Sequence, residues 1–148
     1  MTNLNQILDE VLSDLEVRIE QVKGHVVRAE LPTIAVDAVQ IRQLLQNLIA
    51  NSLKFHRKDV APRVEISAEI RDELCYLTVT DNGIGFEEKY LDRIFTIFQR
   101  LHGRHEYEGT GVGLAVCRRI VERHGGTITA TSKPGEGARF VVTLPVHH

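Results

Sequence analysis

Three polar residues recur along one predicted helix at a spacing that suits a site for a metal ion and a phosphate group. Asn47, Asn51 and Lys54 lie at positions i, i+4 and i+7, so at about 100° per residue they share one narrow strip of that helix. Amide oxygens are hard, neutral ligands suited to Mg²⁺, and a lysine ammonium group suits phosphate oxygens. A solvated helix face is the ordinary explanation for this spacing, but two asparagines are unusual there because Asn is a poor helix former.

The segment from Asp81 to Gly85, with the sequence DNGIG, follows a run of alternating apolar residues that is typical of a strand. Asn-Gly and Asp-Gly sequences are common in tight turns, so the segment by itself indicates only that the strand ends in a turn. The other polar and glycine-rich segments of the chain change this interpretation.

Glycines also mark the start of a later predicted helix, in the sequence EGTGVGLAVCRRIV. Gly109, Gly111 and Gly113 would let backbone N–H groups approach an anion closely, and the helix N-terminus adds partial positive charge. A flexible loop with a glycine cap explains the same residues. The segment is not a P-loop, which needs GxxxxGK[ST], nor a Rossmann fingerprint, because its spacing is GxGxG and no strand leads into it. The HRD and DFG signatures of protein kinases are also absent from the sequence.

The stretch between these two glycine segments includes IFTIFQRLHGRHEYEG and shows only fragments of a helical pattern. Phe95 and Phe98 are followed by Arg100 and Arg104 in a polar, glycine-containing sequence. A loop of about 25 residues is unusual in a compact domain unless it covers a ligand. We therefore expect a lid at about residues 99–108, with an ordinary disordered loop as the alternative.

Hydrophobic periodicity and capping signals predict the elements that must position these residues. Residues 1–20 have the i, i+3, i+4 apolar spacing of a leading amphipathic helix, and Asp37 with Gln40 resembles the N-cap of a long helix that ends near Phe55. The helix opened by glycines ends at the pair Gly125-Gly126. Strands are expected at about 23–30, 63–71, 74–80, 127–132 and 139–144. This order predicts an α/β fold with helices on one face of a sheet.

Composition and charge restrict the class of protein. The 148 residues are most simply one domain, and a formal charge of −2 gives no positive field for nucleic acid or an anionic membrane. We expect no membrane contact, because no apolar run approaches the roughly 20 residues of a membrane span and no signal peptide is evident. Cys75 and Cys117 have no CxxC neighbour, which favours buried, reduced thiols and a cytoplasmic location.

Taken in order, four segments resemble the catalytic ATP-binding domain of sensor histidine kinases, in the gyrase, Hsp90, histidine kinase and MutL ATPase superfamily. QNLIANSLKF is similar to the N box of that family, DNGIG to its first glycine box, IFTIFQR to its phenylalanine box and GTGVGLA to its second glycine box. The tail RRIVERHGGTITATSKPGEGARFVVTLP follows the family's habitual ending. The resemblance covers nearly the whole chain, and we expect residues 1–148 to form a single domain of this kind. It implies a Bergerat-type ATP-binding fold, a two-layer α/β sandwich whose mixed sheet is covered on one face by helices.

The resemblance implies that one end of the site binds the adenine of ATP. Asp81 would accept a hydrogen bond from the adenine amino group, which a carboxylate does well because it only accepts. Gly83 and Gly85 would let the backbone pass the base. Ile84 would pack nearby, and Phe55 would cover the ring.

The resemblance also implies that the other end binds Mg²⁺ and the phosphates. Asn51 would ligate Mg²⁺ with Asn47 close by, and Lys54 would reach a phosphate; these residues and Arg100 are the expected catalytic residues. Further phosphate contacts are expected from Arg100, Arg104, Gly109, Thr110, Gly111, Gly113 and Leu114.

Asn47 decides which reaction the resemblance favours. Members of the superfamily that hydrolyse ATP carry Glu at this place as a general base, because water must lose a proton to attack. A neutral imidazole already has a lone pair, so Asn47 favours phosphoryl transfer to histidine over hydrolysis. The alternatives are a gyrase-type hydrolase and a sensing or docking module that binds ATP without transferring it.

The acceptor histidine is expected on a separate helical hairpin of the parent kinase, in a sequence like His-Glu-Leu-Arg-Thr-Pro. His105-Glu106 is followed by different residues, so the chain looks like an excised catalytic half that is monomeric by itself and cannot label itself. A response regulator would be an indirect partner. Two departures from the family pattern, Ser52 where Ala is common and Ala138 where Thr or Ser is usual, are expected to touch no ligand-binding residue.

Overall fold

A five-stranded mixed sheet forms one layer of the protein. In the computed structural model, which describes residues 1–85 and 110–147, the strands lie in the order β2-β4-β5-β7-β6. β2 (His25–Arg28) runs parallel to β4 (Arg63–Arg71), and the other neighbouring pairs are antiparallel. The remaining strands of this sheet are β5 (Leu74–Asp81), β6 (Thr127–Lys133) and β7 (Gly137–Pro145).

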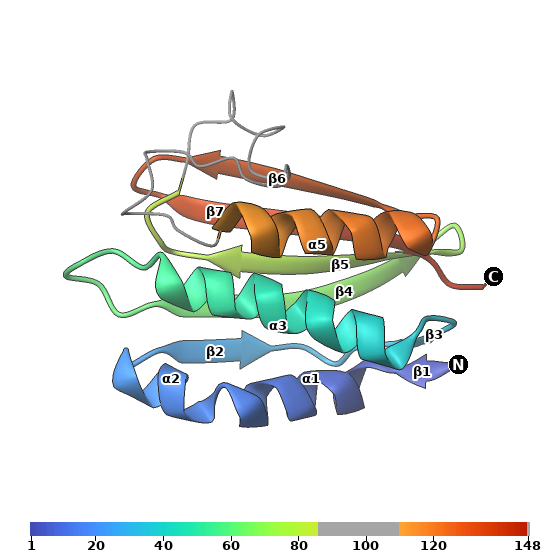
Figure 1. The fold of residues 1–148 in the computed structure, drawn as a ribbon, viewed down its shortest axis with the longest axis horizontal. Coiled ribbons are helices and arrows are strands. Elements are labelled where there is room, and N and C mark those ends of the chain that lie inside the picture. The colour runs from blue at the N-terminus through green and yellow to red at the C-terminus, as the bar shows by residue number, and fades with distance from the viewer. Residues whose placement is uncertain (86–109, 148) are drawn as a thin grey trace.

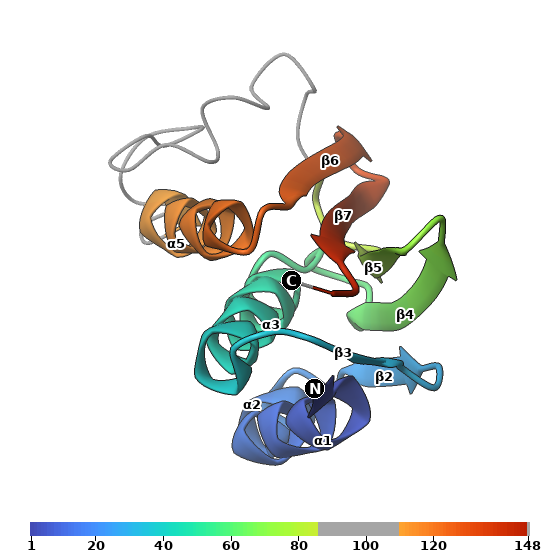
Figure 2. The same ribbon diagram turned by 90° about the vertical axis from the view of Figure 1, so that its right-hand side faces the viewer.

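Helices cover one face of this sheet and form the second layer (Figure 2). α3 (Ala38–Lys54) and α5 (Thr110–Arg123) lie side by side, and α1 (Leu4–Asp14) and α2 (Glu16–Gln21) lie on the other side of α3 (Figure 1). A short antiparallel pair, β1 (Thr2–Asn3) with β3 (Thr33–Ile34), joins the start of the chain to the segment before α3. The predicted two-layer α/β sandwich with a mixed sheet is confirmed.

α3 is the long helix that the sequence predicts, and it begins as predicted. The Asp37 side chain accepts a hydrogen bond from the Gln40 backbone N–H at 3.0 Å, and this cap satisfies one of the free N–H groups of the first turn. The apolar stripe of α3 is fully buried between the sheet and the neighbouring helices, and each buried side chain of the stripe stabilises the fold by roughly 1.5–3 kcal/mol. Cys117 of α5 packs against this helix, and both cysteines are buried and free, as predicted.

The N-terminal segment differs from the single helix expected over residues 1–20. Leu15 interrupts it between α1 and α2, with φ of −96° and ψ of 2°. α1 buries Leu4, Ile7, Leu8 and Val11, whereas α2 buries none of its side chains. α2 packs on the core through the partly buried Ile19, so it is less firmly packed than α1.

The two faces of the sheet differ because successive strand residues point to opposite sides. Val79 and Phe140 are buried under the helices. Thr80 pairs with Arg139, and Arg139 pairs with Thr131, so these three residues share the open face. The inward-facing side chains at the paired ends of β5 and β7 can therefore contribute to a site on the helix side of the sheet.

Candidate functional site

Asp81 ends β5 with its carboxylate beside α3. Its Oδ1 accepts hydrogen bonds from the backbone N–H groups of Gly83 and Ala138, at 2.8 and 3.2 Å, and its Oδ2 accepts one from the Ser52 hydroxyl at 3.0 Å. Burial raises the pKa of the Asp81 carboxyl group above its usual range, and the bonds from Gly83, Ser52 and Ala138 oppose this rise. A carboxylate has about four acceptor positions. The three donors that the described residues supply therefore leave one position, on Oδ2, for an incoming N–H group.

The glycines of DNGIG allow the turn to pack closely against the rest of the chain. A Cβ atom at Gly83 would lie 2.4 Å from the carbonyl oxygen of Phe55, which accepts a hydrogen bond from the Ile84 N–H at 3.0 Å. Gly85 has φ of 67°, and a Cβ atom there would lie 2.2 Å from the carbonyl oxygen of Lys133. These contacts hold the turn between the end of α3 and the β6–β7 hairpin. That the same glycines admit a base stays a prediction.

Asn82 is a positioning residue that the sequence reasoning missed. Its side chain accepts from the Arg63 N–H at 2.8 Å and donates to the Ala61 carbonyl at 3.2 Å, and its own carbonyl accepts from Arg57 Nε at 2.8 Å. These bonds join the end of β5 to the segment between α3 and β4, and they fix the backbone directly after Asp81. The habit of Asn of bonding nearby backbone in turns was the available signal.

The predicted strip of α3 is present, with Asn47 and Asn51 half-buried and Lys54 exposed. At a rise of 1.5 Å per residue the strip is about 10 Å long. The Lys54 ammonium lies 5.3 Å from the centre of the Phe55 ring, a cation–π distance. Burial raises the pKa of Cys117 to about 12, and a hydrogen bond with the Asn47 side chain opposes the rise. Asn47 is thus held between α3 and α5.

α5 begins at Thr110, within the glycine segment that marks the start of the predicted helix. Thr110, Gly111 and Gly113 are in its first turn, where N–H groups lack intrahelical partners. Leu114 is in the second turn, where N–H groups pair within the helix, and its side chain is buried. Arg100, Arg104, Gly109 and the expected lid lie outside the described residues, and their roles stay predictions.

The structure corrects the expectation about the two departures from the family pattern. Both lie on Asp81: the Ser52 hydroxyl donates to its Oδ2, and the Ala138 N–H donates to its Oδ1. The expectation that neither residue touches a predicted ligand-binding residue is therefore wrong. α3 and β7 are far apart in the sequence, so spacing alone could not bring these positions together.

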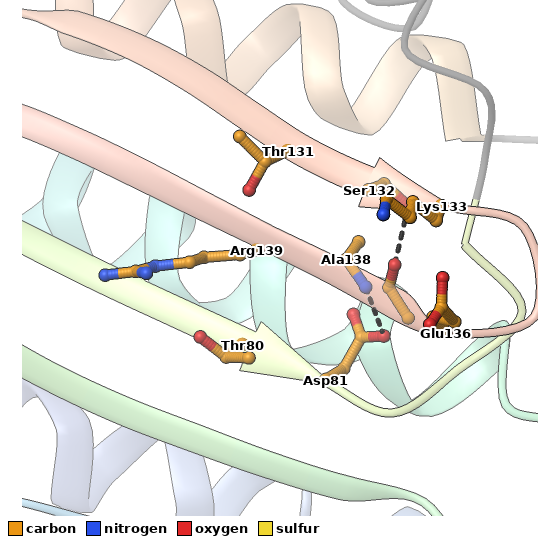
Figure 3. Close-up of a pocket in the computed structure, with 9 residues that line it drawn as sticks. Thr80, Asp81, Thr131, Ser132, Lys133, Glu136, Ala138 and Arg139 are labelled. Atoms are coloured by element: carbon orange, nitrogen blue, oxygen red, sulfur yellow. Dashed lines mark hydrogen bonds between the residues drawn. The ribbon is translucent and has the colours of Figure 1, made fainter.

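A hollow of about 310 Å³ lies beside Asp81 on the open face of the sheet (Figure 3). Thr80, Thr131 and Arg139 line it together with residues of the β6–β7 turn. Its described lining contains no residue of α3, so it lies on the side of Asp81 away from the α3 strip. It is not the space that the resemblance assigns to a nucleotide.

The fold and the site together define an ATPase domain of a known family. Residues 36–148 match the model of the histidine kinase-, DNA gyrase B- and HSP90-like ATPases, and the chain belongs to this family. ATP binding follows from that membership.

Individual relatives narrow the class to histidine kinases. The chain is 46% identical to cyanobacterial phytochrome A of Nostoc sp. over 146 residues, which are 99% of this chain and 19% of that protein. The nucleotide-free catalytic domain of the histidine kinase ThkA matches with a TM-score of 0.84 and 25% identity, over 99% of this chain and 97% of that chain. Full-length ShkA in complex with AMPPNP matches with a TM-score of 0.83 and 27% identity, over 97% of this chain and 30% of that chain. The chain is thus a catalytic domain of the histidine kinase type. Within residues 1–85 and 110–147, no helix has the length and apolar character needed to cross a membrane.

Proposed function

We propose that the chain binds Mg²⁺-ATP and transfers the γ-phosphoryl group to a histidine on a separate phosphoacceptor domain in two-component signalling. The observation that carries the proposal is the contact between Ser52 and Asp81. Ser52 directly follows Asn51, so this contact holds the base-binding carboxylate next to the strip of α3 that carries the amides and the lysine. One strand end and one helix then offer both halves of a nucleotide site.

At the base end, the surroundings of Asp81 fit the amino group of adenine. Two backbone N–H groups hold Oδ1, and Oδ2 keeps one acceptor position among the contacts that the structure describes. An ionised carboxylate cannot donate, so it selects a donor such as an exocyclic amine. Phe55, at the end of α3, would cover the ring of the base.

At the phosphate end, amides and backbone N–H groups fit a metal-bound triphosphate. When bound, ATP supplies the phosphoryl group and Mg²⁺ neutralises charge on the phosphates. Asn51, with Asn47 beside it, would hold the metal, and Lys54 would leave the Phe55 ring to reach a phosphate. No group of three or more His, Cys, Asp or Glu side chains that could hold a metal occurs in the part of the chain that the structure describes. Such a site suits Mg²⁺, which is usually bound by few protein ligands together with phosphates and water.

Asn47 favours transfer to histidine over hydrolysis. An amide cannot take a proton from water, whereas a neutral imidazole needs no base. Its hydrogen bond with Cys117 holds the amide in place rather than activating it, because a thiol whose pKa is raised to about 12 stays protonated at neutral pH. The chain would act by positioning the phosphoryl group for in-line attack.

The partners in this proposal are the phosphoacceptor hairpin of the parent kinase and, indirectly, a response regulator. The domain alone would be a cytoplasmic monomer that contacts neither nucleic acid nor membrane. A formal charge of −2 supports the last two points, because phosphate backbones and anionic lipids attract positive surfaces.

Incubation of the chain with γ-labelled ATP, Mg²⁺ and a hairpin that carries the acceptor histidine tests the proposal. We expect acid-labile label on the hairpin and none on the chain itself. Asn51→Ala should abolish transfer, and Gln6→Ala, an amide deletion at an exposed position of α1, should not. Phosphate released into water without hairpin would instead favour the hydrolase. Binding of ATP with neither outcome would favour the sensing module.

A further inference from the structure

Ser52 is a buried hydroxyl group, 2% exposed, near the end of α3. Its Oγ lies 3.0 Å from Oδ2 of Asp81 and 3.1 Å from the carbonyl oxygen of Leu48. A serine hydroxyl has one hydrogen, so it serves one of these two acceptors at a time. The helix carbonyl four residues earlier is a common partner for serine, but an ionised carboxylate is the stronger acceptor. The hydrogen therefore favours Asp81 while that group is charged.

Among the residues that the structure describes, the opposite side of the same carboxylate is held by backbone groups alone. Oδ1 accepts from the N–H groups of Gly83 and Ala138, and position 138 has a methyl group where the resembled family usually has a hydroxyl. Position 52 has a hydroxyl where that family commonly has a methyl. The two departures thus flank one carboxylate, with the hydroxyl on α3 instead of β7.

We propose that Ser52 positions Asp81 for the amino group of adenine and thereby sets the preference of the site for 6-aminopurine nucleotides. By bonding one acceptor position of Oδ2, the hydroxyl directs the other toward the incoming base. Ser52 acts through Asp81, so it is a positioning residue. This inference rests on the proposed function, because it takes Asp81 as the acceptor of the base.

A measurement without nucleotide gives the first test. Burial raises the pKa of Asp81 and the Ser52 bond opposes the rise, so Ser52→Ala should raise it further. Among the described residues, the charged side chains that line the hollow beside Asp81 are Lys133, Glu136 and Arg139, and Arg57 donates to the carbonyl of Asn82. The Ser52→Ala variant leaves all four unchanged. NMR titration of the Asp81 carboxyl carbon should show the rise. An unchanged titration would mean that the hydroxyl serves Leu48.

A pair of nucleotides separates positioning of Asp81 from general loss of structure. Calorimetry should compare ATP with the triphosphate of nebularine, a purine nucleoside that lacks the 6-amino group. We expect Ser52→Ala to weaken ATP binding about 3- to 10-fold, the usual effect of one hydrogen bond. The affinity for nebularine triphosphate should stay unchanged. Ser67→Ala, the same deletion at an exposed position of β4, should change neither affinity. Equal losses for both nucleotides, or no loss for ATP, would overturn the inference.

Two further variants test whether the hydroxyl acts on Asp81. Ser52→Thr keeps the hydroxyl and should therefore keep the ATP affinity of the wild type. The double variant Ser52→Ala, Ala138→Ser places a hydroxyl on the other side of the carboxylate and should restore the ATP affinity that Ser52→Ala loses. When Asp81 is already replaced by Asn, adding Ser52→Ala should cause no further loss of ATP affinity. A loss as large as in the wild-type background would contradict the inference. Wild-type protein that binds ATP no better than nebularine triphosphate would overturn the base site of the proposed function itself. A wild-type preference for ATP that survives Ser52→Ala would overturn only the role of Ser52.

Discussion

Replacing Asp81 by Asn removes the charge of the side chain but keeps its shape. The amide oxygen can keep the N–H donors of Gly83 and Ala138, and the amide nitrogen then takes the place of Oδ2. There Ser52 can accept from the amide while its own hydrogen turns to the Leu48 carbonyl, 3.1 Å away. We therefore expect Asp81→Asn to leave the fold intact.

The base, in contrast, would meet a donor where the carboxylate offers an acceptor. Loss of a hydrogen bond to a charged group costs about 1.5–3 kcal/mol, or roughly 10- to 150-fold in affinity for ATP. Titration calorimetry of the variant with Mg²⁺-ATP measures this loss. Wild-type affinity in the variant would remove Asp81 from the base site.

The same variant makes a prediction about stability. The pKa of Asp81 is raised in the folded protein, so between the unfolded and the folded pKa the folded state binds more protons. The contribution of the Asp81 carboxyl group to the free energy of unfolding therefore falls as pH rises through that window. At neutral pH the ionised, buried carboxylate still lowers the stability of the fold. Asp81→Asn should unfold at the same or a higher temperature than wild type at pH 7. A lower melting temperature would contradict the reasoning.

Two stability predictions follow from other contacts. Gly83→Ala places a Cβ atom 2.4 Å from the Phe55 carbonyl oxygen and should lower the free energy of unfolding in urea by about 1–3 kcal/mol through overpacking. Gly135→Ala is the control and should cost less, because its φ is 79° but no other described residue has an atom within 4 Å of the new Cβ; equal losses would refute the contact argument. His124 is buried, and its Nε2 accepts from the Asp37 N–H at 3.1 Å, so His124→Leu should cost about 1–3 kcal/mol in the same assay. A wild-type urea midpoint would show that this bond contributes nothing.

Most of the fold could be predicted from the sequence because its signals are local. Alternating apolar residues predicted the strands, and Asp37 with Gln40 predicted where α3 begins. The break at Leu15 could not be predicted, because Leu15 continues the apolar stripe of the first helix and is itself buried. Beyond it α2 has no fully buried side chain and packs on the core through the partly buried Ile19, and this weaker packing is a property of the tertiary structure.

The contacts of the candidate site were less predictable because they join distant segments. Motif order pointed to Asp81, but only the structure shows that Ser52 and Ala138 hold its two oxygens. Gly83 and Gly85 were expected to make room for a base, and the described contacts show them making room for the chain's own backbone. The sequence thus indicated which residues form the candidate site more reliably than it indicated what those residues contact.

A crystal structure of this chain with Mg²⁺ and AMPPNP would test the central claim most directly. We predict the 6-amino nitrogen of adenine at about 2.7–3.2 Å from Oδ2 of Asp81, with the Ser52 hydroxyl still bonded to that oxygen. We also predict the metal on Asn51 and the phosphates between the α3 strip and the first turn of α5. A base bound elsewhere, such as in the hollow beside Arg139, or a metal without Asn51 among its ligands, would contradict the account.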